Sequence, residues 1–446
     1  MPEGRVPAKV AYKTETPNAS IELYNGVMNI AQSNRTFTTE GSIQLKWLPS
    51  RWVRFDIPRI ARGIDTGNAT IELPEFNTQY DAFVTNVSNS IISGVGHSVS
   101  CGGILVHEAI LKRNIDDDSC DEVLFHLPNF KCHRWPGRIN LNDGEWEVTI
   151  DQINSYNKMF ESLNDQGGFA FTHSGVLKKC GKSKLSLEQA NDKLIALHYF
   201  LSFVNGAWCG PVLSIGRADS KTNWEIWSAP NLTPWKSVSS WFNDVEPKTI
   251  DETFKGFMIL WNDCDWRETI KTAIHWYVEA NIGAGGVEGA IVLTQTALEL
   301  LAWVYLIETS ETPAYTVDSF EKLHADKKIS LLLESMKIPT HIPKELNELV
   351  MFRKLLRERK TQKYNGPQMF TFIRNQIVHD RTGSPDKMSD IPFDVKSETH
   401  ELGLWYLELV LLFLCKHRGN YCRRYVHGYH DDVIACVPWV EPNISR

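Results

Sequence analysis

The feature that most constrains the fold is a change of hydrophobic period near residue 255. Before it, short runs rich in Val, Ile, Thr, Phe and Trp are separated by turn signals, as in IELYNGVMNI, GEWEVTIDQI and GFAFTHSGVL, which indicates β-strands. After it, apolar residues recur at the spacing of amphipathic helices, between Gly and Pro breakers. The sequence therefore predicts an α+β protein: a β-rich N-terminal region over residues 1–255, then an all-α antiparallel helical bundle over residues 256–446.

Local signals refine this division. In the β-rich region, Asn-Gly, Asp-Gly and Gly-Gly dipeptides and the pair Asp219-Ser220 predict turns. Ser186 and Gln189 form a capping box ahead of one helix that Gly206 can end. A break near residue 165 is the candidate border between two subdomains. Six helices are predicted after residue 255, and a short hairpin or extended tail after the last: residues 266–281, 288–308, 319–336, 344–360, 367–380 and 398–417.

The composition excludes several classes of protein. Of 446 residues, 42% are hydrophobic and 23% charged, which are globular values, so a disordered or fibrous chain is excluded. The net charge of -7 argues against a nucleic-acid coat protein, though not against an enzyme with a local basic patch. Nine cysteines without a Cys-x-x-Cys pair indicate a reducing compartment. The chain starts without an apolar leader, and the apolar stretches 290–307 and 404–415 are expected to be buried helices, which predicts a cytoplasmic protein with no membrane contact.

Common catalytic and cofactor motifs are absent from the sequence. It has no phosphate-binding Gly-rich loop, no dinucleotide-binding fingerprint, no His-Glu-x-x-His and no Gly-x-Ser-x-Gly. Cysteines and histidines gather near the C-terminus, but their spacing matches no standard zinc pattern. We therefore predict no metal and no cofactor. The residues of this group are Cys415, His417, Cys422, His427, His430 and Cys436.

The most informative short stretch is RNQIVH, residues 374–379, near the end of a predicted helix. Breakers follow it, so His379 is expected in or after the last turn, where the negative helix end favours an imidazolium. Arg374 supplies a planar cation suited to phosphate oxygens. Asn375 lies four residues before His379 and can orient the ring or hold a phosphate. A guanidinium and a titratable imidazole suffice to cleave RNA without a metal.

The spacing of this pair is not distinctive by itself, since Arg and His recur throughout the chain. Arg423 and Arg424 lie at comparable distances from His430. The structural alternative is that Arg374 is a surface or ion-paired helix residue, and that His379 caps the helix C-terminus.

The stretch resembles the signature of the HEPN superfamily, in which an Arg, a polar residue, three more residues and a His end a helix of a bundle. Asn375 fills the polar position. Residues 288–308 resemble the long early helix of that family, including Ala-Leu-Glu at 297–299. The end of the chain, LWYLELVLLFLCKHRGNYCRRY followed by VPW, looks like the close of bacterial HEPN proteins of the ApeA type, which are cytoplasmic anti-phage proteins. The resemblance covers about residues 256–440.

The resemblance implies a metal-independent endoribonuclease that works as a homodimer, in anti-phage defence or stress growth arrest. Arg374 would stabilise the phosphate transition state, His379 would act as general acid and base, and Asn375 would support them. On a regular helix, residues at i and i+5 lie about 140° apart, so two facing copies would pool their side chains in one cleft. The β-rich region is a natural place to sense a phage-derived trigger or regulatory partner.

A second segment is a candidate for contact with RNA. It is RKLLRERKTQK, residues 353–363, which places Arg353, Arg357 and Lys360 along one helix face. The alternative is a solvated face, since Glu358 interrupts the run. Two other functions stay open. One is a non-catalytic dimerisation or RNA-binding interaction protein. The other is a carbohydrate- or peptide-binding β protein, favoured by tryptophans of which most are expected in the core: Trp208, Trp224, Trp227, Trp235 and Trp241.

Overall fold

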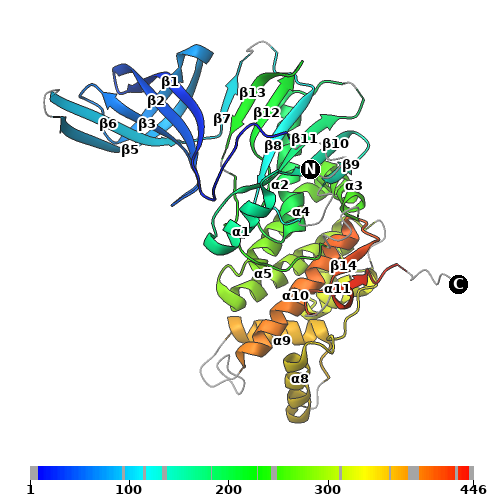
Figure 1. The fold of residues 1–446 in the computed structure, drawn as a ribbon. Helices are drawn as coiled ribbons and strands as arrows, with labels where there is room; N and C mark the ends of the chain where they lie inside the picture. Colours follow the sequence, from blue (N-terminus) through cyan, green and yellow to red (C-terminus); the bar gives the residue numbers. More distant parts are fainter. Residues whose placement is uncertain are drawn as a thin grey trace. The chain divides into compact units, whose positions relative to one another are not determined.

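The computed structural model describes residues 9–92, 96–113, 117–132, 138–181, 183–228, 230–242, 249–310, 314–360, 363–379, 391–426 and 430–440. The chain forms two compact units. The first, the β unit, comprises residues 1–198 and 209–236, and the second, the helical unit, comprises residues 199–208 and 237–446. The predicted α+β class is confirmed, with a β-rich N-terminal part followed by helices (Figure 1).

The first part of the β unit is a closed antiparallel barrel in the order β1-β2-β3-β6-β5-β4. Its interior is filled by apolar side chains that alternate with outward-facing ones, such as Ile43, Phe55 and Ile71, each 2% exposed or less. Closure leaves these strands without a free edge. The strands are β1 (Ile21–Gln32), β2 (Arg35–Lys46), β3 (Trp52–Ile60), β4 (Gly67–Leu73), β5 (Thr78–Ile92) and β6 (Gly96–Leu105), with the short helix η1 (Pro74–Phe76) between β4 and β5.

Two of the dipeptides that predicted turns lie inside barrel strands instead. Asn25 and Gly26 continue β1, where Gly26 pairs with Gly41 of β2. Gly102 and Gly103 continue β6, and a Cβ on Gly103 would collide with the Phe83 carbonyl of β5. The first dipeptide lies within IELYNGVMNI, which was predicted as a strand, and that prediction is confirmed. A turn at Gly102-Gly103 was wrong, because glycine also serves where neighbouring strands approach closely.

The second part of the β unit is an antiparallel sheet in the order β7-β13-β12-β8-β11-β10-β9 (Figure 1). The predicted turns at Asp143-Gly144 and Asp219-Ser220 are confirmed, and both residues of the second have positive φ. The change from barrel to sheet falls after Leu105, whereas residue 165 lies inside helix α1 (Tyr156–Gln166). The strands are β7 (Ala109–Lys112), β8 (Glu122–Pro128), β9 (Arg138–Asn142), β10 (Trp146–Gln152), β11 (Phe171–Lys179), β12 (Val212–Ala218) and β13 (Lys221–Trp227).

Helix α2 (Leu187–Asn205) begins and ends where the sequence indicated. The Gln189 backbone N–H donates to Ser186 Oγ at 3.2 Å, and the Ser186 N–H donates to Gln189 Oε1 at 3.3 Å, which completes the capping box. Gly206 ends the helix with φ +68. Most of the named tryptophans are buried as expected, while Trp235 is half-buried.

The helical unit is built around α5 (Gly286–Trp303), which contacts α4, α7, α9 and α10 (Figure 1). The predicted helices are all present, although the segment 319–336 is divided into α6 and α7. Helix α3 was not predicted, and the expected border at residue 255 falls inside it. The elements are α3 (Thr249–Asn262), α4 (Cys264–Asn281), α5, the π-helix η2 (Val304–Glu308), α6 (Val317–Glu321), α7 (Ala325–Ser335), α8 (Asn347–Lys360), α9 (Gly366–Val378), α10 (Phe393–Leu414), β14 (Asn420–Cys422), α11 (His430–Val433) and β15 (Ile434–Cys436).

Helix α5 and its extension η2, residues 286–308, are together long and apolar enough to cross a membrane. Half of the apolar window is buried inside the structure, against the four neighbouring helices. The helix is therefore covered on one side by the other helices of the unit.

A buried ion pair joins α10 to the C-terminal segment. Glu408 has no exposed surface, and it accepts two hydrogen bonds from Arg424, at 2.9 and 3.0 Å. Tyr277 of α4 donates to the same carboxylate at 2.7 Å, and Arg424 donates to Asn281 at 2.9 Å. Burial alone would lower the pKa of Arg424, whereas Glu408 and Glu401 raise it above its usual value. The guanidinium therefore stays charged and ties α4, α10 and the C-terminal segment together.

We predict that Arg424→Met lowers the free energy of unfolding by about 3–5 kcal/mol, because it leaves the Glu408 carboxylate buried and unpaired. Urea denaturation followed by far-UV circular dichroism measures the loss. Lys255→Met is the control, since it breaks an exposed pair with Asp251 and should lose less than about 1 kcal/mol. Equal losses for the two variants would contradict a special role for the buried pair.

Candidate functional site

Helix α9 carries the predicted catalytic residues and is fixed at its start and along one face. The Gln368 backbone N–H donates to Asn365 Oδ1, and the Asn365 N–H donates to Gln368 Oε1, both at 3.0 Å. This capping box, with Pro367 in the first turn, defines the N-terminus. Phe370 and Ile373 are fully buried, and α9 packs on α5, α7 and α10. The helix is therefore a rigid support for whatever its other end carries.

His379 lies at the other end of α9, as the breakers predicted. It follows the last helical residue, with φ -117 and ψ 33, and its backbone N–H donates to the Asn375 carbonyl at 2.9 Å. Its side chain is exposed. The backbone of His379 thus closes the last turn, while its imidazole is open to solvent.

Arg374 lies one turn earlier and is half-buried. Its Nη1 donates to Asn375 Oδ1 at 3.3 Å, and its Nε is buried with no hydrogen-bond partner among the described residues. Within those residues Arg374 has no carboxylate in ion-pair range. The side chain of Asn375 thus contacts Arg374, and no hydrogen bond to the His379 ring is seen in the described part of the chain.

The end of α9 lies beside the start of α10. The two helices are antiparallel, since Gly366 meets Tyr406 and Phe370 meets Gly403. Continuing this register places Val378 and His379 level with the first turn of α10. At this end two large apolar side chains are exposed, Phe393 to 65% and Val378 to 44%. Contiguous apolar patches mark interaction surfaces, and these two side chains are the candidates for one at this end of α9.

The predicted RNA-binding stripe lies on α8, which packs on α10. The Leu349 N–H in the first turn of α8 donates to Glu398 of α10 at 2.7 Å. Arg353 is half-buried and Arg357 is exposed, one turn apart on the same face. The side chain of Lys360 lies outside the described residues. Helix α10 therefore supports both the stripe and the α9 motif.

Among the described residues, the Cys and His side chains near the C-terminus do not gather into a group of three potential metal ligands. Cys415 is buried at the end of α10, and Cys422 and Cys436 lie on β14 and β15. The side chains of His427 and His430 lie outside the described residues, so the alternative pairs of His430 with Arg423 or Arg424 have no described geometry. Arg424 is occupied by Glu408.

His417, also of this group, is fully buried and fixed by two hydrogen bonds. Its Nε2 lies 3.2 Å from the Asn420 carbonyl, and its Nδ1 lies 2.7 Å from Thr253 Oγ1. A carbonyl can only accept, so Nε2 carries the proton of the neutral ring, and Nδ1 accepts the single Thr253 hydroxyl proton, which is then not donated to the Thr249 carbonyl 3.1 Å away. Burial lowers the pKa of His417 from its usual 6.5 to about 4. The ring is therefore neutral at physiological pH.

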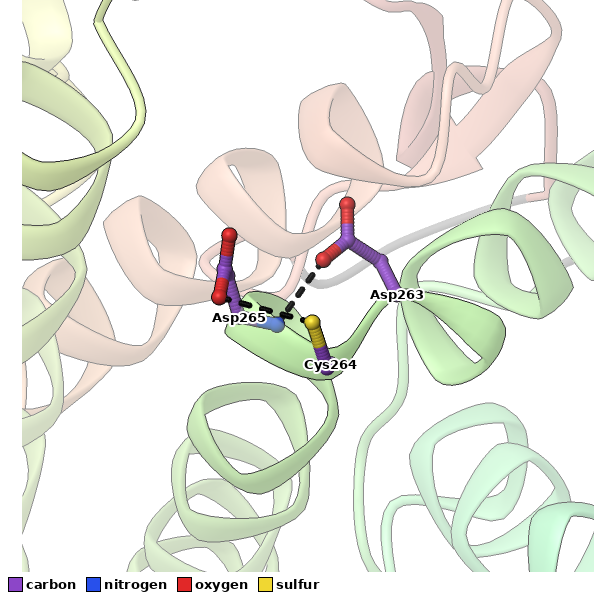
Figure 2. A group of neighbouring side chains, drawn as sticks. All are labelled: Asp263, Cys264 and Asp265. Atoms are coloured by element: carbon purple, nitrogen blue, oxygen red, sulfur yellow. Dashed lines mark hydrogen bonds between the residues drawn. The ribbon is translucent and has the colours of Figure 1, made fainter.

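The described residues contain one group of three potential metal ligands, Asp263, Cys264 and Asp265 (Figure 2). All three are exposed. Asp263 is the N-cap of α4 and accepts from the Asp265 N–H at 2.8 Å, and the Cys264 thiol reaches Asp265 Oδ1 at 3.5 Å. Helix capping accounts for this arrangement, and it carries no metal assignment.

Two stretches of the chain match described protein domains. Residues 263–432 match the YopA C-terminal domain, and residues 115–238 match the YopA central domain. The chain is 26% identical over 453 residues to the SPbeta prophage-derived uncharacterized protein YopA of Bacillus subtilis (strain 168), covering 95% of each chain. No solved structure matches.

These matches locate the candidate site without naming its chemistry. Residues 374–379 and the α8 stripe lie within the stretch similar to the YopA C-terminal domain, while the barrel strands lie before both matched domains. The matched descriptions name no activity. The resemblance to HEPN proteins therefore stays a prediction.

We predict that the neutral state of His417 makes the fold sensitive to acid. Between pH 6.5 and about 4, His417 is protonated in the unfolded chain but neutral in the folded chain. The free energy of unfolding therefore falls as the pH falls, by up to about 1.4 kcal/mol per pH unit. His417→Gln keeps a donor and an acceptor and should lower this slope in urea titrations by the share of one proton, while His126, His198 and His400, whose pKa values burial also lowers to about 4, keep their shares. His324→Gln, at an exposed position, should leave the slope unchanged. Identical slopes for the unaltered chain and both variants would contradict a neutral His417 in the folded state.

Proposed function

We propose that the chain is a metal-independent endoribonuclease of the HEPN type that works as a homodimer in the cytoplasm. The observation that carries the proposal is the presentation of Arg374 and His379 at the accessible end of α9, where no described carboxylate neutralises the guanidinium. Arg374 then binds the phosphate and stabilises the charge that develops on it. His379 transfers protons. Asn375 holds Arg374 through its amide oxygen.

The reaction needs no group beyond these side chains. A neutral imidazole removes the proton of the ribose 2′-hydroxyl, whose oxygen attacks the adjacent phosphorus. The bond to the 5′-oxygen breaks, and an imidazolium supplies the proton to that leaving oxygen, so the products end in a 2′,3′-cyclic phosphate and a 5′-hydroxyl. One imidazole does both tasks poorly at once. A dimer supplies two, one as base and one as acid, with the two guanidinium groups beside the phosphate.

RNA is proposed to reach the site along α8, where Arg353, Arg357 and Lys360 follow one face and contact the phosphate backbone. The relative of similar length is prophage-derived. This supports a role for the chain in the contest between phage and host, as an effector of anti-phage defence or stress growth arrest. The β unit is then the proposed sensor of a phage-derived trigger or regulatory partner.

The alternative is a non-catalytic dimerisation or RNA-binding protein. It is favoured by the exposed apolar side chains on three helices of the same unit: Met351 and Leu355 on α8, Val378 on α9 and Phe393 on α10. An interaction module needs such a surface and does not need His379.

We predict that the purified full chain cleaves RNA in the presence of EDTA and leaves 2′,3′-cyclic phosphate ends. His379→Ala and Arg374→Ala should each slow cleavage by about a hundredfold to ten-thousandfold, because proton transfer or charge stabilisation is lost. Cleavage is measured on gels, with end-group analysis of the products. The double variant should lose little more than either single one, since the two groups act as a unit.

The matched controls are His324→Ala and Arg62→Ala, which remove the same side chains from exposed positions elsewhere. Both should cleave as the unaltered chain does. A folded, RNA-binding chain without cleavage would favour the interaction protein. Cleavage that survives in His379→Ala would exclude the proposed chemistry.

A further prediction concerns the dimer. Phe393→Asp places a charge on the apolar surface beside the end of α9, so it should convert dimer to monomer in light scattering and reduce cleavage in parallel. Ile259→Asp is the control, since Ile259 is 53% exposed on α3 and the same change there should leave the dimer intact. A monomeric unaltered chain that cleaves RNA at full rate would contradict the composite site.

A further inference from the structure

A cavity of about 720 Å³ opens in the helical unit, where the C-terminal ends of α7 and α10 meet η2 and the segment after β15. This volume lies within the ~300–1,000 Å³ typical of small-molecule sites. The cavity is separate from the candidate RNA site. From the level of the α9 end, α10 runs about 25 Å to the cavity at 1.5 Å per residue.

The walls of the cavity are aromatic. Tyr305, Phe413 and Trp439 are half-buried, so each offers ring surface to the interior. The Phe413 and Trp439 rings meet edge to face at 5.3 Å between centroids, and Tyr305 meets Phe413 at 6.3 Å. The Trp439 indole N–H donates to the His417 carbonyl at 2.8 Å, which fixes the indole plane. These contacts hold the three rings in place along one apolar wall of the cavity, against which a flat ring can pack.

The rim of the cavity is cationic. Lys337, Lys416 and Arg418 line it with exposed side chains, and none of them has an ion-pair partner among the described residues. No Asp or Glu belongs to its described lining. The neutral ring of His417 adds no charge. Three cations therefore face one apolar space without an anion.

The backbone supports these positions in an uncommon way. Lys337 and Lys416 follow the ends of α7 and α10, and both have φ +57. Glycine or asparagine adopts this conformation at lower cost. Lysine there complements the helix dipole, but the dipole alone does not explain why both lysines line one aromatic cavity. Tyr305 lies on the π-helix η2, a form that is rare and frequent at functional sites.

We propose that this cavity binds a small planar aromatic molecule that carries a phosphate group. The ring lies among Tyr305, Phe413 and Trp439, and the phosphate takes hydrogen bonds from Lys337, Lys416 and Arg418. A phosphate monoester, with nearly two negative charges, balances three cations better than a carboxylate with one. A nucleotide and a flavin mononucleotide share this chemistry, and the two are separated by experiment.

Isothermal titration calorimetry of the full chain tests the proposal, with AMP, UMP and flavin mononucleotide as probes. At least one should bind, and the same ring without phosphate, as adenosine, uridine or riboflavin, should bind at least about tenfold more weakly. Inorganic phosphate alone should also bind at least about tenfold more weakly, since it lacks the ring. Preference for AMP or UMP identifies a nucleotide site, and preference for flavin mononucleotide identifies a flavin site.

Arg418→Ala, Lys337→Asn and Lys416→Asn should each weaken the binding by about tenfold, and asparagine tolerates the positive φ, so these variants should fold. Lys354→Asn, on α8, removes a cation elsewhere and should bind as the unaltered chain does. The proposal is overturned if none of the three phosphate probes binds, or if their binding is the same in the cavity variants and in Lys354→Asn.

Discussion

The packing of the helical unit depends on the hydrogen-bond and ion-pair partners of one buried carboxylate. Glu408 lies in the middle of α10 with no exposed surface, and such a position is costly for a charge unless it is paired and hydrogen-bonded. Arg424 and Tyr277 supply the partners from the C-terminal segment and from α4. Three segments distant in sequence therefore have to meet at one point. A shift of α10 by one residue would leave the Glu408 carboxylate buried without these partners, so the pair favours a single register.

The register of α10 then determines what its two ends carry. Toward its N-terminus, α10 packs on α8 and α9 and so supports the cationic stripe and the end of α9. At its C-terminus it turns through Lys416 into the segment that brings Trp439 against His417. The close approach of α3 to this end needs Gly256, because a Cβ there would collide with the Cys415 carbonyl. One central helix thus places both candidate sites.

The sequence predicted the secondary structure that follows from hydrophobic periodicity and helix capping. It did not predict the contacts between residues that are distant along the chain. The change from strands to helices, the capping box of α2 and the end of α9 follow from neighbouring residues, so they could be read directly. Helix α3 was missed because it begins in the stretch where the β-like pattern ends. The barrel closure, the pair of Glu408 with Arg424 and the aromatic cavity combine residues from separate segments, and no spacing rule reveals them. In the candidate site, the exposure of His379 was predictable, but the contact of Asn375 with Arg374 in place of the imidazole was not.

A chain of net charge -7 can still carry two candidate sites for phosphate, because charges are distributed unevenly over it. Several cations elsewhere are neutralised in place, as in the pairs of Arg138 with Asp151 and Lys396 with Glu288. The cations of the two candidate sites whose side chains are described have no ion-pair partner among the described residues. About 25 Å of helix separates the sites, several times the screening length of about 8 Å at physiological salt. Binding of a phosphate at one candidate site should therefore have little direct electrostatic effect on binding at the other. Any coupling between the two binding events would have to pass through the packing of α10.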